Sequence, residues 1–282
     1  MEDFKKGVRF SALAVREEFR NANFYLFLII VFFVLQFCFS GVGDYLASQK
    51  DKMNIFELYI PFMSCRTSQI IYLIGILLFS CGVNFFNTGT AYYLIRADKN
   101  VWVIGRLLYL METLVFYNAF LLLNLWWACG GRLSVRARWS EAYLAASQYG
   151  SESIGIWPIV QFSYGLTGNN PNVLGFFSLL LAILIGLIVG ALVINFHQRN
   201  RLVYGVLAII GIWYLDILVE NTPNLKNILY ISPFGLSRLY RLSLNGGGPV
   251  TWYAISYLAC LFLAILYISR NQSEKIDFIK IE

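Results

Sequence analysis

Residues 87–106 have the sequence NTGTAYYLIRADKNVWVIGR, a polar stretch that lies between two long apolar runs. The stretch begins with Asn87, Thr88 and Gly89, a combination that turns the chain and caps the start of a helix. Charged side chains follow within it. This pattern predicts a short helix just outside a membrane, joining two spans. The alternative is an ordinary connecting loop.

The composition of the whole chain supports a membrane setting. Hydrophobic residues make up 58% of the 282 residues and charged residues only 13%, with a mean hydropathy of +0.62. Because soluble domains carry about 25% charged residues, we expect an integral membrane protein. A span needs roughly 20 apolar residues, so the length accommodates about six helices and leaves no room for a second folded domain.

Six apolar runs fit the length of a transmembrane helix, which predicts an all-α membrane fold in a single domain over 1–282. The first run lacks a small-residue cleavage site and is expected to remain in the mature protein. Trp102 and Trp127 stand near the two ends of the third run, where aromatic side chains anchor a span. The predicted spans are 24–42, 70–86, 101–127, 173–196, 202–219 and 251–269.

The first 23 residues are predicted to form an amphipathic helix. Apolar residues recur there at steps of three and four, and basic residues occupy the remaining arc. Such a helix lies in the membrane interface with its cations toward anionic headgroups. The alternative is a soluble, partly disordered tail. The apolar positions are Phe4, Val8, Ala12, Val15 and Phe19.

The distribution of Lys and Arg predicts the orientation. Six spans put both chain ends on one side, and most of the 22 Lys and Arg residues fall in the segments on that side. Because positive charge accumulates in cytoplasmic segments, we expect both termini and 87–106 to be cytoplasmic. The net charge of +6 is then explained by the excess of Lys and Arg in cytoplasmic segments, so nucleic acid is not an expected partner.

The loop also carries a resemblance to a known family. Its spacing is similar to the cytosolic loop of ABC exporter permeases of the type-2 class, most of all to the single-chain permeases of Gram-positive bacteria with a separate ATPase polypeptide. The layout of spans extends the likeness loosely over the whole chain. The residues that carry it are Gly89-Thr90, Tyr93-Leu94-Ile95-Arg96, Lys99, Trp102, Gly105 and Arg106.

The resemblance implies a set of elements and partners. It implies an elbow helix at 1–23, a coupling helix at 88–99 that docks on the ATPase, and short re-entrant helices before the last span. It also implies a bacterial cell membrane, a second permease chain in a homo- or heterodimer, and export of an amphipathic peptide, drug or lipid-like substrate. Because the chain has no G-x-x-x-x-G-K-[ST] motif, ATP and Mg would be bound by the partner ATPase, and this chain needs no cofactor.

We predict that the coupling helix contacts the ATPase mainly through Arg96. On a helix that starts near Thr88, Tyr92 and Ile95 share a face with Arg96, and this mixture suits a protein contact. The alternative is that Arg96 and Lys99 extend to lipid headgroups. The predicted docking residues are Thr88, Gly89, Tyr92, Tyr93, Ile95, Arg96 and Lys99.

Three acidic residues are candidates for a translocation path. Glu112 lies about half way along the third run, where a carboxylate normally faces the bundle interior; a structural hydrogen bond is the alternative. Asp216 and Glu220 are four residues apart and share a face near the outer surface. They could attract a cationic substrate or balance Arg238 and Arg241, and we favour the balance.

Catalytic and metal sites are not indicated. His197 is the only histidine, and the five cysteines form no C-x-x-C pair, so we expect neither a catalytic residue nor a metal in this chain. Cys65 and Cys129 both fall in outer loops, where a disulfide could join them.

Further segments carry structural predictions. Residues 43–69 are predicted to form a solvent-exposed loop because they carry charged residues, namely Asp44, Lys50, Asp51, Lys52, Glu57 and Arg66. Residues 128–172 form the longest connection, in which 156–160 is too short and too broken by proline to span, and dips toward the interface or caps the bundle. Gly186 and Gly190 allow close helix packing, with a dimer contact as the alternative. Residues 225–230 and 236–244 could each form a short helix.

Two other functions fit the same features. The first is a membrane scaffold or sensor that needs no ATPase and binds an outer ligand through 128–172. The second, an intramembrane enzyme, ranks last for lack of a catalytic set.

Overall fold

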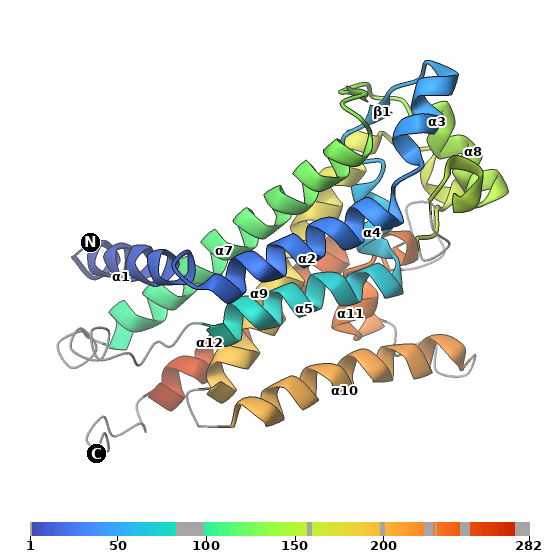
Figure 1. Cartoon of the computed structure of the whole chain (residues 1–282). Helices are drawn as coiled ribbons and strands as arrows, with labels where there is room; N and C mark the ends of the chain where they lie inside the picture. Colours follow the sequence, from blue (N-terminus) through green and yellow to red (C-terminus); the bar gives the residue numbers. More distant parts are fainter. Residues whose placement is uncertain are drawn as a thin grey trace.

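The computed structural model describes residues 2–82, 99–156, 160–197, 201–222, 228, 230–242 and 249–273. Most of these residues lie in helices, which confirms the all-α prediction (Figure 1). The long helices are α1 (Glu2–Glu18), α2 (Ala22–Cys38), α5 (Arg66–Gly82), α7 (Lys99–Ala128), α9 (Pro171–His197), α10 (Leu202–Asn221) and α12 (Thr251–Ser273). The short elements are α3 (Val42–Gln49), β1 (Met53–Asn54), α4 (Tyr59–Ser64), β2 (Leu133–Ser134), α8 (Glu141–Tyr149), η1 (Ser151–Ile154), η2 (Tyr164–Leu166), α11 (Pro233–Leu236) and η4 (Leu239–Arg241).

The chain is a helical membrane protein. Within the described residues, four helices are long and apolar enough to cross a bilayer: Val101–Ala128, Pro171–His197, Leu202–Asn221 and Thr251–Arg270. Helices α1 and α2 together would make a fifth span, although they meet at a 71° bend. The apolar part of α5, Arg66–Ser80, is shorter. Each of the six apolar runs of the sequence lies at least partly in one of the long helices.

Helix α9 is the centre of the bundle. In its most apolar stretch 67% of the residues are buried, against 22% in α10 and in α12. Glycines allow this close packing: a Cβ at Gly186 would lie 2.5 Å from a Leu114 methyl group, and one at Gly190 would lie 2.7 Å from Leu110. The predicted packing role of the glycine pair is therefore confirmed, because both glycines face α7 inside the chain.

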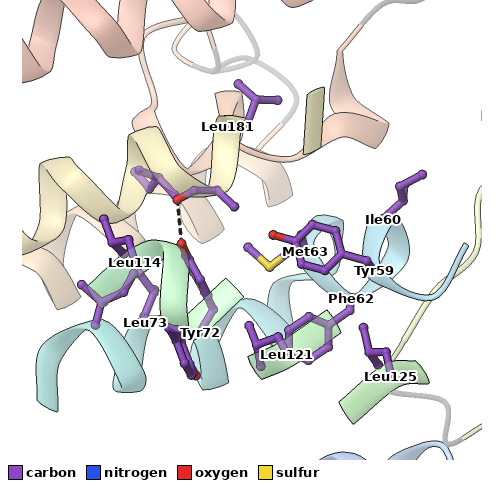
Figure 2. Close-up of a cluster of buried hydrophobic side chains, with 14 of the residues drawn as sticks. Tyr59, Ile60, Phe62, Met63, Tyr72, Leu73, Leu114, Leu121, Leu125 and Leu181 are labelled. Carbon is purple, nitrogen blue, oxygen red and sulfur yellow. Dashed lines mark hydrogen bonds between the residues drawn. The ribbon is translucent and has the colours of Figure 1, made fainter. Parts of the chain in front are cut away.

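Tyrosine side chains tie α9 to the surrounding helices. The Tyr72 hydroxyl of α5 donates a hydrogen bond to the Ala182 carbonyl of α9, at 2.8 Å (Figure 2). Tyr72 also stacks on Tyr117 of α7, with the ring centroids 5.6 Å apart. Asn118 Nδ2 donates to the Tyr72 hydroxyl at 3.2 Å, so the buried hydroxyl has both a donor and an acceptor among its partners. These bonds fix the register of three helices in an apolar core.

Helix α1 packs against α7 through a face that the sequence analysis did not identify. The predicted apolar stripe is largely exposed, with Phe4 55% and Val8 40% accessible. The buried face is instead built from small residues: a Cβ at Gly7 would lie 2.7 Å from Ile104. One face of α1 therefore packs against α7, and the opposite apolar face is exposed. The buried positions are Gly7, Phe10, Ser11, Ala14 and Glu18.

Residues 42–65, 129–156 and 160–170 fold together into what we call the cap. The sequence analysis predicted a solvent-exposed loop for the first segment and an irregular connection for the second. The structure instead pairs β1 with β2 in parallel, with Met53 opposite Leu133. Asn54 Nδ2 adds hydrogen bonds to the Arg136 carbonyl at 2.6 Å and to Asn172 Oδ1 at 2.7 Å. Cys129 is a free thiol, so the suggested Cys65–Cys129 disulfide is absent.

The two ends of the bundle differ. The cap, with α3 and α8, stands at one end, which we call the cap end (Figure 1). The corner between α1 and α2 lies at the other, which we call the elbow end, together with the start of α7 and the last described turn of α12 (Figure 1). The start of α1 and the last described turn of α12 therefore lie toward the same end of the bundle.

Two predicted segments have a different length or lie outside the described residues. The helix predicted for 236–244 is replaced by the shorter pair α11 and η4, because Ser232 and Pro233 start a helix earlier and the chain turns at Ser237. The helix predicted for 225–230 falls mostly outside the described residues, as do 157–159.

Candidate functional site

The predicted docking residues fall almost entirely outside the described part of the chain. Residues 83–98 lie outside the described part of the chain. They include six of the predicted docking residues: Thr88, Gly89, Tyr92, Tyr93, Ile95 and Arg96. Lys99 is the first residue of α7. Helix α5 ends at Gly82 and α7 begins at Lys99, and Figure 1 shows both of these points at the elbow end.

Asp216 lies at the centre of a buried ionic cluster at the cap end. Its side chain is 1% exposed on α10 and accepts a hydrogen bond from Ser232 Oγ at 2.6 Å. Arg238, which is fully buried, forms an ion pair with Asp216 Oδ2, and Arg241 Nη1 lies 3.2 Å from Asp216 Oδ1. Both carboxylate oxygens are therefore occupied by charged or polar donors.

Glu220 extends the same cluster by one turn of α10. It forms ion pairs with Arg66 at the start of α5 and with Arg241. Arg238 Nη1 lies 3.4 Å from Glu220 Oε2, and the Tyr240 hydroxyl lies 3.5 Å from Glu220 Oε1. The balance of Asp216 and Glu220 by Arg238 and Arg241, which the sequence analysis favoured, is thus present in the structure.

The local sequence explains how the arginines reach the carboxylates. Ser232 caps α11 by accepting a hydrogen bond from the Gly235 amide at 3.1 Å, and Pro233 occupies the first turn, where its missing N–H is not needed. A Cβ at Gly235 would lie 2.8 Å from Asp216 Oδ1. Only glycine lets this turn approach Asp216 so closely, and the approach brings Arg238 onto the carboxylate.

Arg238 also connects the cluster to α5. Its Nε donates to Gln69 Oε1 at 3.2 Å, and Gln69 Nε2 donates to Ser237 Oγ at 2.8 Å. The cluster therefore joins α5, α10 and the α11–η4 segment; Asp216, Arg238 and Gln69 are buried, whereas Glu220 and Arg66 are partly exposed. Breaking a buried ion pair by removing one partner costs about 3–5 kcal/mol, because the other charge stays buried. This arrangement closes the cap end of the bundle.

Glu112 does not face the bundle interior; of the two alternatives for this residue, the structure shows the structural hydrogen bond. Its side chain is exposed on α7 and accepts a hydrogen bond from Ser11 Oγ of α1 at 3.3 Å. The reason is that α1 packs along this part of α7, so the carboxylate meets a partner outside the bundle. Nothing in this geometry joins Glu112 to Asp216 or Glu220.

Arg106, near the start of α7, is a second buried cation. Its side chain is 5% exposed, and Nη2 donates to Asn195 Oδ1 of α9 at 3.2 Å. Ser269 of α12 donates to the same oxygen at 2.6 Å, and the guanidinium lies over the Trp102 ring at 4.1 Å. No carboxylate forms an ion pair with Arg106 in the described part of the chain, and its Nε has no hydrogen-bond partner there.

A buried carboxylate holds the cap together. Glu57 is fully buried; Oε1 accepts from the Ser140 amide at 2.8 Å, and Oε2 accepts from the Ser140 hydroxyl. Burial raises the pKa of Glu57 from 4.5 to about 7, although the Ser140 hydrogen bonds oppose this shift. Repulsion from Asp51 raises the pKa slightly further. The bond thus links two cap segments that lie far apart in the sequence.

Several of these residues were missed by sequence analysis. Arg66 and Gln69 were assigned to a loop, and Glu57 was taken as a solvent-exposed charge. The sequence does contain one usable signal: the Ser232-Pro233 step is a helix-start pattern. Among the described residues, no three His, Cys, Asp or Glu side chains gather closely enough to hold a metal ion.

Comparison with known proteins gave no match. No family model, no curated protein and no solved structure is similar enough to this chain to assign it to a family.

Proposed function

We propose that the chain is the membrane-spanning permease subunit of an ATP-driven exporter. The observation that carries this proposal is the order of its elements. An elbow-like helix precedes the bundle, a polar connection joins α5 to α7 at the elbow end, and a pair of short helices precedes α12. The type-2 ABC permeases that the loop sequence resembles share this order.

The proposal extends the fold to six spans. Helices α2 and α5 are shorter than the other four long helices of the bundle, but both run between the elbow end and the cap end, as Figure 1 shows. The bend between α1 and α2 separates a helix that lies along the interface from one that crosses the bilayer. The exposed apolar stripe of α1, including Phe4 and Val8, then faces lipid.

The orientation follows from charge. With most Lys and Arg residues in the segments at the elbow end, that end is cytoplasmic and the cap is outside the cell. The end of α5 at Gly82 and the start of α7 at Lys99 are then on the cytoplasmic side, where an ATPase would meet the connection between them. Helices α5 and α7 flank this connection, so a push on it is delivered to two bundle helices at once.

In this mechanism the elbow end receives the movement of the ATPases, and the cap end couples α5 to α10. ATP and Mg bind in two partner ATPases, whose closure moves the coupling helix at 88–99 and tilts α5 and α7. The ionic cluster around Asp216 and Arg238 ties α5 to α10 at the cap end, so this tilt is passed across the bundle. A path for an amphipathic substrate then opens outward between two permease chains. The chain itself hydrolyses no ATP.

The test is the association with an ATPase. The tagged chain is purified from its native membrane in a gentle detergent, and bound proteins are identified by mass spectrometry. We expect a Walker-motif ATPase that is lost from the variant Arg96→Glu, because reversed charge on the docking face repels its partner. The matched control is Lys280→Glu, which makes the same change near the chain end and should retain the ATPase. An ATPase that stays bound to Arg96→Glu would overturn the docking role.

A second candidate function rests on the cap. The cap is a folded unit with its own buried hydrogen bonds, such as those between Glu57 and Ser140, where a simple transporter loop would need none. This favours, as the alternative, a membrane scaffold or sensor that binds an outer ligand and needs no ATPase. Absence of ATP-dependent substrate movement in the complete reconstituted system would favour this alternative.

A further inference from the structure

A cavity of about 180 Å³ lies in the corner between α1 and α2, at the elbow end. It is well above the roughly 15 Å³ that holds a single water molecule, so a small organic group fits inside. Residues from three helices line it: Glu18, Asn21, Asn23, Phe24, Phe27, Leu78 and Phe79.

One wall of this elbow cavity carries a buried carboxylate. Glu18 is only 6% exposed, and no hydrogen bond or ion pair joins its carboxylate to another residue in the described part of the chain. Tyr109, which has an electrostatic interaction with Glu18, donates its hydroxyl hydrogen to the Phe79 carbonyl at 3.0 Å. A buried carboxylate without a partner is costly, so a positive group in the cavity would relieve it.

The opposite walls are aromatic. The Phe24 and Phe79 rings meet edge to face with centroids 5.4 Å apart, and Phe27 lies 6.1 Å from Phe79 in the same geometry. Phe19, on the other side of the corner, lies 5.0 Å from Phe24. Aromatic faces attract organic cations, most strongly where water is excluded. A carboxylate beside several phenylalanine rings is the side-chain chemistry that recognises an ammonium group.

The same cavity is poorly equipped to hold an anion. The start of α2 could in general attract a negative group, but its first amides are already used. The Asn23 amide donates to Asn21 Oδ1 at 3.0 Å, and the Phe24 amide donates to the Asn21 carbonyl at 3.1 Å. The Glu18 carbonyl at the end of α1 is likewise used, because it accepts the Asn21 amide at 3.0 Å, so the preference of the cavity for a cation rests on the Glu18 carboxylate.

The cavity is also open toward an apolar surface. Leu78 lines it and is 47% exposed, and the neighbouring exposed residues of α2 are apolar, among them Leu26 and Ile30. A ligand with its charged group against Glu18 can therefore extend a hydrocarbon chain along α2 and α5. The site is suited to an amphipathic molecule rather than to a free inorganic ion.

From this geometry we propose that the elbow cavity binds the ammonium group of an amphipathic molecule, with Glu18 as the counter-charge and Phe24, Phe27 and Phe79 as an aromatic cage. This site goes beyond the proposed transport function and does not depend on an ATPase. Two sources share the required chemistry: a soluble amphipathic amine and the headgroup of a membrane lipid.

The test measures binding of labelled hexyltrimethylammonium to the full chain in nanodiscs of phosphatidylglycerol. We expect saturable binding that hexyl sulfate does not displace. Glu18→Gln should weaken the affinity by at least about tenfold, because it removes the counter-charge from a largely desolvated site. The matched control is Glu17→Gln, which makes the same change at the adjacent exposed position and should leave the affinity unchanged.

Two results would overturn the proposal: equal affinity in the Glu18→Gln and Glu17→Gln variants, or displacement of the probe by hexyl sulfate. If Glu18→Gln fails to fold, Phe79→Leu decides, since it removes a ring but keeps an apolar side chain. An affinity about threefold or more below wild type supports the cage, and an unchanged affinity contradicts it.

The source of the ligand is found by changing the lipid. Phosphatidylethanolamine then replaces part of the phosphatidylglycerol. If this lowers the probe affinity of the wild-type chain but not that of Glu18→Gln, a lipid headgroup is the occupant. An unchanged affinity assigns the site to a soluble amphipathic cation.

Discussion

The two ends of the bundle differ in whether their buried charged residues form ion pairs with other described residues. At the cap end, Asp216 and Glu220 are surrounded by three arginines, and every carboxylate oxygen in the cluster has a donor. At the elbow end, Glu18 and Arg106 are both buried, and neither forms an ion pair with a described residue. Asp216 and Arg238 are as buried as Glu18 and Arg106, so these two pairs of residues differ in their partners and not in their burial.

This contrast predicts that the cap end is held in one arrangement, whereas the elbow end is stabilised by binding another group. A paired and hydrogen-bonded cluster holds helices in one arrangement. A buried charge without a counter-charge raises the energy of the fold and is lowered by whatever supplies the missing group, whether ligand, lipid or protein. We therefore expect the cap end to determine stability and the elbow end to determine binding.

The largest expected effect is at Arg238. Replacing it by Met keeps most of the volume but leaves Asp216 buried against fewer cations, and should lower the free energy of unfolding by about 3–5 kcal/mol. The measurement is unfolding of the purified chain in detergent. Arg138→Met, at an exposed cap position, is the matched control and should change stability by less than about 0.5 kcal/mol.

A double variant sharpens this prediction. Combining Arg238→Met with Asp216→Leu removes both buried charges of the pair, and should recover much of the stability that Arg238→Met loses. If Arg238→Met is as stable as Arg138→Met, the cluster does not close the cap end.

A slightly smaller effect concerns pH at the cap. The pKa of Glu57 is about 7 in the folded cap, against 4.5 for an exposed glutamate. A carboxyl with a raised pKa stabilises the fold fully below about pH 4.5, and this contribution is lost as the pH rises through 7. The loss amounts to about 3 kcal/mol at most.

Hydrogen exchange of α8 and β2 at pH 5 and pH 8 measures this change. Exchange should be faster at pH 8 than the intrinsic rate accounts for, and Glu57→Gln should remove the difference. A pH dependence that survives in Glu57→Gln would assign the effect to another group.

The smallest expected effect is at Arg106. Arg106→Gln removes a buried charge that has no described counter-charge, and it also removes the contact with the Trp102 ring, which contributes about 1 kcal/mol. These changes oppose each other, so stability should stay within about 1 kcal/mol of wild type. A loss as large as that of Arg238→Met would mean that Arg106 is paired after all, and the contrast between the ends would fail.

Much of the helical layout could be predicted from the sequence. The six apolar runs all lie at least partly in long helices, because hydropathy over about 20 residues is a strong signal. The pairing of Asp216 and Glu220 with Arg238 and Arg241 could also be anticipated, since opposite charges near one membrane surface have few other partners.

The rest depends on contacts between distant segments. The cap exists because β1 meets β2 and Glu57 meets Ser140 across 83 residues, and neither contact has a local pattern. The packing face of α1 was missed because Gly7 and Ser11 are small rather than hydrophobic. Glu112 was expected inside the bundle because a charge in the middle of a span is costly in lipid, but Ser11 of α1 supplies a hydrogen bond on the outer side of α7.

The most direct test of the permease proposal is hydrogen exchange on the chain purified with its native partners, compared with the chain after those partners are removed by a stronger detergent. The account predicts that the partners slow exchange in 83–98 and at the start of α7, with little change in the cap. Protection confined to the cap would contradict it, and would favour a scaffold or sensor that binds its ligand outside the cell.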